Sequence, residues 1–483
     1  MRMTPRISRA CFAADLLVSA SLCLGQPAAG PKPSPVSIQG SLRTRLESWD
    51  WFGAAGAGSY LYSGSLARLS LGQQFRTLDW QVEFAAPFLI GLPGTAIAAP
   101  PQGQLGLGGS YFAANDRSRH AGMAFVKQGF VRLKGGSHSL RLGRFEFNDG
   151  TEVTPKDPTL ATLKRTRVAQ RLIGAFGFSH VGRSLDGAQY SLNRPGGNVT
   201  VVAALPTRGV FQVDGWGNLR TAVAYAAATK PVASGKSAGE VRVFGIYYQD
   251  WRRVLKTDNR AAAARAADTG NVRIGTFGGH YIHAAQTAAG TLDFLFWGAA
   301  QTGRWGTLDH RAGAAAVEAG YQPRCALKPW LRAGLFHSTG DGDTRDSSHG
   351  TFFQIMPTPR IYAQFPFYNL MNNRDLFATL ALRPHKALSL AGGVHSLRLA
   401  ERADLWYLGG GAFQPWTFGY VGRPSGGNRG LATVLDVSAD YAVNSHVTLS
   451  GYVAHAAGKS VVASIYPDGR NARFGYIELT WRF

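Results

Sequence analysis

Arginine is the residue type of this sequence best placed to do chemistry, since it accounts for 40 of the 51 basic residues. Its planar guanidinium presents a fork of donors that grips carboxylates and phosphates. Several arginines alternate along the chain with apolar residues, so that they would share one face of a strand. We predict an anion-binding surface built from Arg43, Arg45, Arg68, Arg132, Arg144, Arg242, Arg273, Arg332 and Arg383.

Wall bracing is the alternative role for the same arginines, and both roles can hold at once. The carboxylates that could pair with them across a shared face are Glu47, Asp79, Glu83, Glu146, Asp436 and Glu478. In the block of Arg141, Arg144 and Glu146, the sequence does not settle which face each residue occupies. Strict alternation places Arg141 on one face of the strand and Arg144 and Glu146 on the other. Either a bulge intervenes there or one of the two arginines faces the rim.

Other chemistries find little support in the residues. Asp341, Asp343 and Asp346 have the carboxylate density of a Ca²⁺ site, but no glutamate follows at the twelfth position, which favours an Asp/Gly turn. The neighbours at 179–180 and 337–338 pair serine with histidine, yet adjacent strand residues point to opposite faces. No phosphate loop, dinucleotide fingerprint or His/Cys ligand cluster appears. We therefore predict no enzyme, no catalytic residue, no bound metal and no cofactor.

The elements that must position the arginines are strands with a period of two. In the last stretch, Phe483, Trp481, Leu479 and Ile477 fall on one side, and Arg482, Thr480, Glu478 and Tyr476 on the other. The same alternation starts at 38–47 and recurs along the chain. An apolar face toward lipid and a polar face toward a watery lumen are typical of the strands of an outer-membrane β-barrel.

Counting such runs predicts an all-β, transmembrane antiparallel β-barrel of a single domain, with eighteen strands in a range of 16 to 18. Short joins alternate with long connections at 148–182, 251–269, 338–373, 399–428 and 458–470. An even count returns both termini to the periplasm and places the long connections outside the cell. The connection at 338–373 carries six aromatic residues, so we expect it to fold into the mouth of the pore; packing against other loops outside the pore is the alternative.

Composition agrees with export to the outer membrane. Residues 1–30 read as a signal peptide cleaved between 25 and 30, a proline-rich lead-in follows at 31–35, and the barrel occupies 36–483. No run of eighteen apolar residues follows the signal, which excludes an ordinary transmembrane helix. The formal charge of +22 usually suggests nucleic acid, which an exported chain seldom meets. The expected partners are outer-membrane lipid, an anionic solute and the barrel-assembly machinery, with periplasmic export partners as a further option.

Three blocks of the sequence resemble the alginate export porin family. They are 128–150 (QGFVRLKGGSHSLRLGRFEFNDG), 163–187 (LKRTRVAQRLIGAFGFSHVGRSLDG) and 338–384, which contains STGDGD and HGTFFQIMPTPRIYAQFPFYNLMNNRD. The resemblance implies an eighteen-stranded barrel whose arginine-rich lumen passes an anionic polyuronate or its oligomers. A polyuronate carries a carboxylate on each sugar, and a ladder of guanidinium forks would lower the electrostatic barrier along such a pore. A general anion-selective porin is the alternative, and an exported adhesin or outer-membrane enzyme is the alternative of another class.

Overall fold

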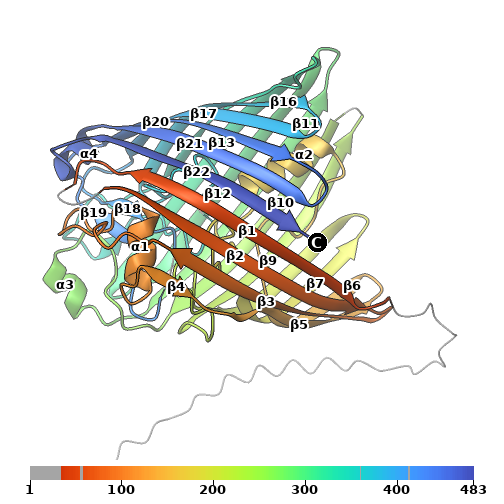
Figure 1. Ribbon diagram of the computed structural model, residues 1–483, viewed down its shortest axis with the longest axis horizontal. Coiled ribbons are helices and arrows are strands. Elements are labelled where there is room, and N and C mark those ends of the chain that lie inside the picture. Colours follow the sequence, from red (N-terminus) through yellow and green to blue (C-terminus); the bar gives the residue numbers. More distant parts are fainter. Residues whose placement is uncertain (1–33, 55–57, 236, 359, 412–413) are drawn as a thin grey trace, which may run out of the picture.

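A computed structural model describes residues 34–54, 58–235, 237–358, 360–411 and 414–483. The predicted signal peptide at 1–30 and residues 31–33 of the proline-rich lead-in lie outside the described residues. The described chain forms one β-barrel with helices and loops inside it and at one end (Figure 1).

The barrel is one sheet of 20 strands, of which β4 (His120–Gly122) and β15 (Ser348–His349) are short additions. The other eighteen make the wall, so the predicted fold and strand number are confirmed. They are β1 (Ser37–Asp50), β2 (Ser59–Gln74), β3 (Leu78–Ile90), β5 (Phe125–Gly135), β6 (His138–Phe145), β7 (Leu185–Arg194), β8 (Gly197–Pro206), β9 (Thr221–Ser234), β10 (Ser237–Asp250), β11 (Val272–Gln286), β12 (Gly290–Trp305), β13 (Leu308–Pro323), β14 (Trp330–Ser338), β16 (Asn373–His385), β17 (Leu388–Leu399), β20 (Gly430–Ala442), β21 (Val447–Gly458) and β22 (Asn471–Arg482).

The sheet closes where the first strand meets the last. β1 pairs with β22 in antiparallel register from Ser41 opposite Arg482 to Asp50 opposite Arg473. Beyond that ladder, Gly40 and Phe483 exchange two backbone hydrogen bonds of 3.0 Å. Because every wall strand has a neighbour on both sides, the barrel leaves no open edge in the wall.

Alternation separates an outer apolar face from a polar and aromatic inner face. On β22 the exposed residues include Ile477, Leu479 and Trp481, while Phe474 points inward and is buried. The same pattern leaves Phe277 of β11 and Leu376 of β16 more than 60% exposed. Exposed side chains of this size form the belt that an outer-membrane barrel presents to lipid.

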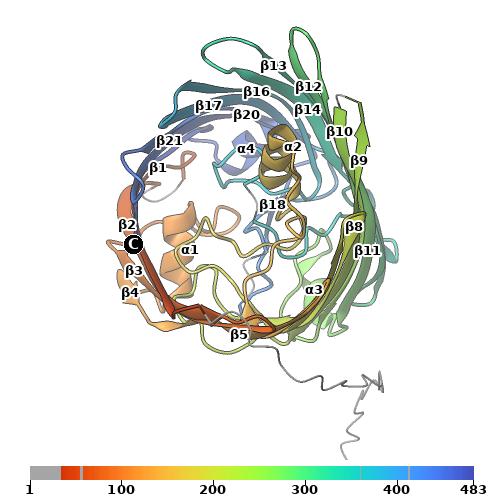
Figure 2. The same ribbon diagram turned by 90° about the vertical axis from the view of Figure 1, so that its right-hand side faces the viewer.

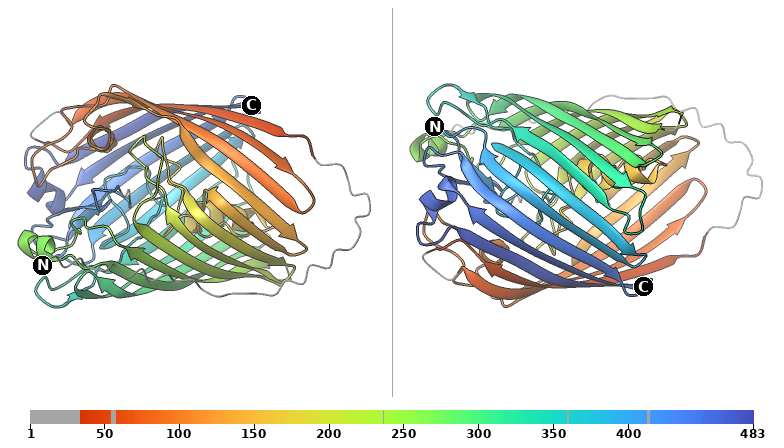
Figure 3. Two further views of the ribbon diagram at one scale, coloured as in Figure 1. Left: turned by 90° about the horizontal axis from the view of Figure 1, so that it is seen from below. Right: turned by 90° about the horizontal axis from the view of Figure 1, so that it is seen from above.

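Turns and loops are divided between the two ends of the barrel (Figure 3). Both ends of the wall, at β1 and β22, lie at the end with short hairpins, which is the periplasmic end in outer-membrane barrels. The long connections leave the opposite end. They contain α1 (Leu107–Ala114), α2 (Pro158–Leu163), a π-helix η1 (Lys164–Val168), α3 (Ala262–Ala267), α4 (Ser460–Ile465) and a hairpin of β18 (Trp406–Leu408) with β19 (Val421–Arg423). Among the described residues, no helix is both long and apolar enough to cross a membrane.

The long connections turn back into the barrel instead of spreading outside it. Figure 2, which looks into the end with the C-terminus, shows α1, α2 and β18 inside the ring of strands. Connections 148–182 and 338–373 pair with each other there: Ile173 bridges Met356, and Met356 N donates to Leu172 O at 2.9 Å. The third connection, 399–428, joins them through Tyr420, whose hydroxyl donates to Ile355 O at 3.2 Å.

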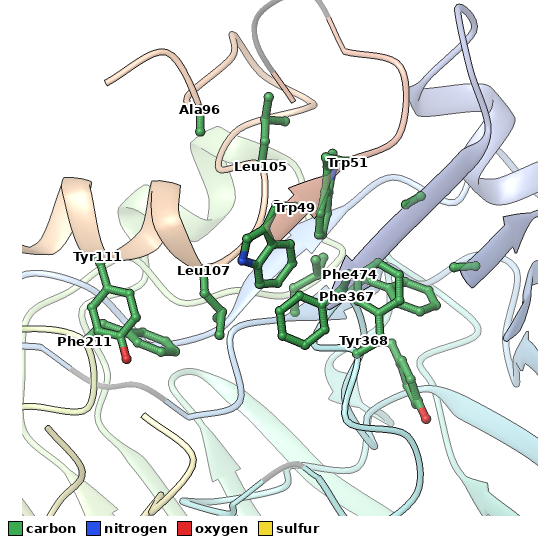
Figure 4. Close-up of a cluster of buried hydrophobic side chains, with 14 of the residues drawn as sticks. Trp49, Trp51, Ala96, Leu105, Leu107, Tyr111, Phe211, Phe367, Tyr368 and Phe474 are labelled. Atoms are coloured by element: carbon green, nitrogen blue, oxygen red, sulfur yellow. The ribbon is translucent and has the colours of Figure 1, made fainter. Parts of the chain in front are cut away.

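The aromatics of connection 338–373 explain its inward path. Phe365 packs on inward-facing Trp49 of β1 and Phe474 of β22, with ring centroids 6.0 and 5.7 Å apart. Phe367 packs against Phe52, with ring centroids 5.7 Å apart. Figure 4 shows Phe367 and Phe474 gathered with Trp49, Trp51 and Tyr368 in one cluster. Farther along the wall, Tyr362 meets Phe377 of β16, with ring centroids 4.8 Å apart. The predicted inward folding is therefore confirmed.

One glycine makes room for the neighbouring loop. Gly64 of β2 faces inward, and a Cβ placed there would lie 2.3 Å from Nε2 of His180, which belongs to connection 148–182. Any larger residue would push the loop away from the wall.

Candidate functional site

The candidate site is a cavity of about 470 Å³ inside the barrel, between the wall and the inward-folded loops. The wall contributes residues of β14, β16, β17, β20 and β21, such as Thr379 and Asp436. Connections 148–182 and 338–373 cover it from the centre of the lumen. Its volume is in the range of sites that hold small molecules.

Basic residues outnumber acidic residues in the lining. Among the described residues that line the cavity, four are arginines and one is acidic, Asp436. Two of the arginines, Arg165 and Arg167, belong to η1; Arg332 belongs to β14, and Arg360 to connection 338–373. A concave surface with this charge excess attracts anions and concentrates field lines within the cavity.

The position of Arg165 and Arg167 is set by the short helix that precedes them. Asp157 caps α2 by accepting from Leu160 N at 2.9 Å, and Pro158 occupies its first turn, a favoured place for proline. The next residue after α2, Lys164, then fixes the segment to the wall through an ion pair of 2.7 Å with Glu240 of β10. Burial lowers the pKa of Lys164, and the facing Glu240 opposes that shift.

The four arginines differ in how far their charges are compensated. Arg332 is paired with Asp293 and, at 3.2 Å, with Glu318. Arg167 lies 3.8 Å from Glu318 and donates to Ile361 O at 3.0 Å. Arg165, in contrast, is exposed and has no hydrogen-bond or ion-pair partner in the part of the chain that the structure describes. It is the arginine that most directly offers its fork to a solute.

Arg360 lies in the wall of loops at the same cavity. Its guanidinium stands 4.6 Å from the ring centroid of Phe178. Burial lowers the pKa of Arg360 to about 10, so the side chain keeps its charge at neutral pH. The cavity therefore contains positive charge contributed by two different loops and one strand.

Most of the arginines predicted from the sequence do face the interior, but they are paired there. Arg45 binds Glu478 at 2.6 Å, and Arg68 binds Glu83 and, at 2.9 Å, Glu146. Arg242 binds Glu152 at 3.0 Å, with both side chains fully buried. Arg43 donates to Gly177 O at 2.6 Å and lies 3.6 Å from Glu478. The bracing alternative therefore describes these four, which tie strands and loops together.

Two more predicted residues line the interior toward the periplasmic end. Arg132 is 39% exposed at its side chain and lies 3.9 Å from Asp79, a weak ion pair. Arg383 is exposed near the end of β16, on the same parity as inward-facing Phe377. Of the nine predicted arginines, only Arg332 belongs to the cavity itself.

The predicted lumen position is wrong for Arg273 and Arg144. Arg273 is exposed between buried Val272 and Ile274, on the outward parity of Phe277. The reason is that β11 places its apolar residues inward at this level, where they pack with the loops, which reverses the usual alternation.

Arg144 is two residues from exposed Leu142 and so lies on the outer face of β6, where it stands opposite Asp186 of β7. It holds Asp186 through two bonds of 2.6 and 2.7 Å. Arg141 takes the inward position and lies 4.2 Å from the ring centroid of Phe145. Glu146 returns to the interior because β6 ends at Phe145.

Sequence reasoning missed Arg165, Arg167 and Arg360 because alternation assigns faces only to strand residues. A signal was present: Asp157 and Pro158 are typical of a helix start, and they come just before a cluster of three basic residues. A helix inside a long connection would have identified these arginines as candidates. Nothing comparable precedes Arg360.

The carboxylates at 341–346 act as turn caps. Oδ1 of Asp343 accepts from Arg345 N at 2.9 Å, and Oδ1 of Asp346 accepts from Ser348 N at 2.8 Å. These bonds confirm the predicted Asp/Gly turn. Among the described residues, no cluster of three or more His, Cys, Asp or Glu side chains is arranged to hold a metal ion.

Comparison with known proteins agrees with the fold. Residues 226–464 match the family model described as alginate export. No curated protein matches the sequence. Solved structures with the same fold include Pseudomonas aeruginosa OccK9 (OpdG), at 12% identity and a TM-score of 0.57, covering 93% of this chain and 98% of that one.

Two further neighbours show the same barrel. Pseudomonas aeruginosa OpdK with vanillate has 9% identity and a TM-score of 0.56 over 92% of this chain and 98% of that one. Acinetobacter baumannii OccAB2 has 8% identity and a TM-score of 0.57 over 93% and 98%. Likeness at these identities extends to the fold and no further.

Proposed function

We propose that this outer-membrane barrel, which its match over residues 226–464 relates to the alginate export family, passes an anionic polysaccharide or its oligomers through an arginine-lined lumen. The observation that carries the proposal is the cavity with four arginines against one carboxylate. Charge that is already paired in the wall contributes little to this, because it is neutralised locally. The guanidinium of Arg165, which has no partner among the described residues, contributes most.

Such a site must bind the carboxylates of the passing chain weakly, one after another. A uronate carboxylate would accept two parallel hydrogen bonds from a guanidinium fork. Transport needs binding that is favourable enough for entry and loose enough for exit. An exposed arginine on a loop, backed by the wall arginine Arg332, which Glu318 and Asp293 hold in place, meets both conditions.

The inward loops would set the size limit of the path. They interlock through the bridge of Ile173 with Met356, and connection 338–373 packs against β22 through Phe365 and against β16 through Tyr362. A solute must therefore pass beside them along the wall or displace them. Passive passage of an extended, single-file polymer fits this restriction better than passage of a compact solute.

Reconstitution in a planar bilayer under a salt gradient tests the proposal. We expect a reversal potential that shows preference for anions, and a current that oligouronates reduce at low salt. The reduction should weaken at high salt, because exposed charges are screened beyond about 8 Å at physiological ionic strength. A cation-selective pore would contradict the proposal.

The variant Arg165→Gln isolates the cavity. It should shift the reversal potential toward cations and weaken block by oligouronates, while Arg144→Gln, which removes an equal charge from the outer face, should leave both unchanged. Equal effects of the two variants would show that overall charge, and not the cavity, sets selectivity.

A general anion-selective porin is the second candidate. One neighbour of the same fold was crystallised with vanillate, a small carboxylate. For the present chain, this candidate predicts the same ion preference with no dependence on the length of the oligouronate. Titration with oligouronates of increasing length separates the two functions.

A further inference from the structure

Two arginines on the outer face of the barrel stand directly opposite each other. Arg374 of β16 and Arg398 of β17 are cross-strand partners near the end that carries the long loops. Both are exposed, on the outward parity of Leu376 and Val394. Neither has a hydrogen-bond or ion-pair partner in the described part of the chain.

This arrangement is unfavourable for the barrel alone. Like charges directly opposite on a sheet repel, whereas opposite charges attract. Neighbouring outward cations at the same end are compensated: Arg304 binds Asp309 at 2.9 Å, and Arg429 binds Glu401 at 3.2 Å. Arg374 and Arg398 differ from these two cations in lacking an anionic partner among the described residues. Exposed Arg273 and Arg311 also lack one there, but neither stands opposite a second unpaired arginine.

More donors surround the pair. His337 of β14 is exposed and lies opposite Arg374 in register. Lys459 reaches the outward side chain of Ser396 with an Nζ to Oγ distance of 3.4 Å. Three groups that can donate to an anion thus lie on the neighbouring strands β14, β16 and β17, and Lys459 reaches the same outward surface from the connection after β21.

The apolar belt begins immediately below these cations. Leu376 and Val394, the outward residues nearest along β16 and β17, are 61% and 42% exposed. On the adjoining strands, a groove of about 790 Å³ runs over Leu435, Val437 and Val453 and reaches β17 at Gly392. A ligand that fits both parts has an anionic head and long apolar chains.

We propose that Arg374 and Arg398, with His337 and Lys459, form a binding site for the phosphate of a phosphorylated glycolipid in the outer leaflet. The guanidinium fork matches phosphate geometry. The site lies at the end opposite the start of β1 and the end of β22, which faces the cell exterior in outer-membrane barrels. Basic clusters at the edge of an apolar membrane surface are a recurrent way to hold lipid head groups.

The site is independent of the lumen, since its residues point outward. Binding there would stabilise the barrel in its membrane without touching the transported solute. Lipid binding at this site is therefore independent of the proposed channel function.

Native mass spectrometry of the detergent-solubilised full barrel tests the site. The probe is a bis-phosphorylated, multiply acylated lipid A; its dephosphorylated form, phosphatidylglycerol and inorganic phosphate are the comparison ligands. We expect the wild-type protein to retain lipid A in preference to all three. The double variant Arg374→Gln/Arg398→Gln should lower its affinity for lipid A about tenfold or more, by the usual contribution of cations near anionic lipid.

The matched control is Arg304→Gln/Lys386→Gln. It removes the same charge from a compensated outward arginine and from the turn that joins β16 and β17 at the opposite end. Wild-type affinity in this control, with reduced affinity in the Arg374/Arg398 variant, supports the site. Unchanged affinity in that variant, equal loss in the control, or equal retention of phosphatidylglycerol would each overturn it, and competition by inorganic phosphate alone would point to a free anion instead.

Discussion

Arg242 and Arg165 lie in two regions of the interior and differ in their contacts. One is buried in an ion pair, and the other is exposed at the cavity. Arg242 is fully buried on β10 and holds Glu152 of connection 148–182 at 3.0 Å. Arg165, farther along the same connection, is exposed beside the cavity, without a partner in the described chain. Arg242 fixes the loop in place, and the fixed loop leaves Arg165 open toward the cavity.

The comparison shows that the number of arginines in a lumen is a poor measure of its selectivity. Arginines that are paired with carboxylates leave little net charge, and their removal affects stability. Arginines without partners contribute net charge, and we expect their removal to change the passage of a charged solute. Four changes test this distinction.

The largest effect is expected from Glu152→Gln. It leaves Arg242 buried and unpaired, and breaking a buried ion pair in this way costs about 3–5 kcal/mol. The free energy of unfolding, measured on the detergent-solubilised barrel, should fall by that order, and the single-channel current should become noisier as the loop loosens. Glu401→Gln, which breaks the exposed pair with Arg429, is the control and should cost at most about 1 kcal/mol.

Removing both partners should be milder than removing either one. In Arg242→Gln/Glu152→Gln, no buried charge is left alone, so the two losses should be non-additive by about 0.5–3 kcal/mol. A complete cycle of unfolding free energies measures this coupling. Simple additivity would show that the two side chains act independently, against their 3.0 Å contact.

A pH effect of smaller size is expected at Asp149, in the same region. Burial raises the pKa of Asp149 from 3.8 to about 6, although Arg242 acts in the other direction. The folded protein therefore binds this proton more tightly than the unfolded chain, and the stability it contributes below about pH 4 is lost as pH rises through 6.

Asp149→Asn removes that titration while keeping an oxygen that can accept from Ile173 N, a bond of 2.9 Å in the wild type. The midpoint of thermal unfolding of the variant should then fall less steeply between pH 4 and 7 than that of the wild type. At pH 7 the variant should be the more stable of the two. Asp346→Asn, at an exposed turn, is the control. An unchanged pH profile would show that Asp149 has no part in it.

The smallest stability effect is expected from Arg165→Gln. An exposed residue without a partner should change the free energy of unfolding by less than about 0.5 kcal/mol. The same variant should nevertheless shift the reversal potential, as described above. A clear loss of stability would place Arg165 among the bracing arginines and remove the distinction.

Sequence alternation predicted the wall well, since period two is imposed by the backbone of every strand. The eighteen strands agree with those expected, including the terminal run that ends at Phe483. Alternation also gave the inward position of Arg45, Arg68 and Arg242. It was wrong at Arg273, where packing of the loops reverses which face is apolar.

The candidate site could be predicted only in part. Its cavity depends on where two loops dock, and docking is decided by contacts between residues far apart in sequence, such as Phe365 with Phe474. The aromatic content of 338–373 indicated an inward fold, but no periodic pattern could place Arg165 or Arg360. The ion pair of Arg242 with Glu152 could not be predicted either, because Glu152 is a loop residue and alternation does not place it.

The seam between β1 and β22 has a consequence for how the barrel is made. The strand that begins the wall can receive its second neighbour only when the final residues of the chain arrive, since Gly40 bonds to Phe483. Until then both strands present unpaired backbone edges, which are templates for adding the wrong strand. Contacts between the two ends of a chain also form slowly. The wall therefore keeps an open edge until β1 and β22 pair, and the hydrogen bonds between Gly40 and Phe483 close it.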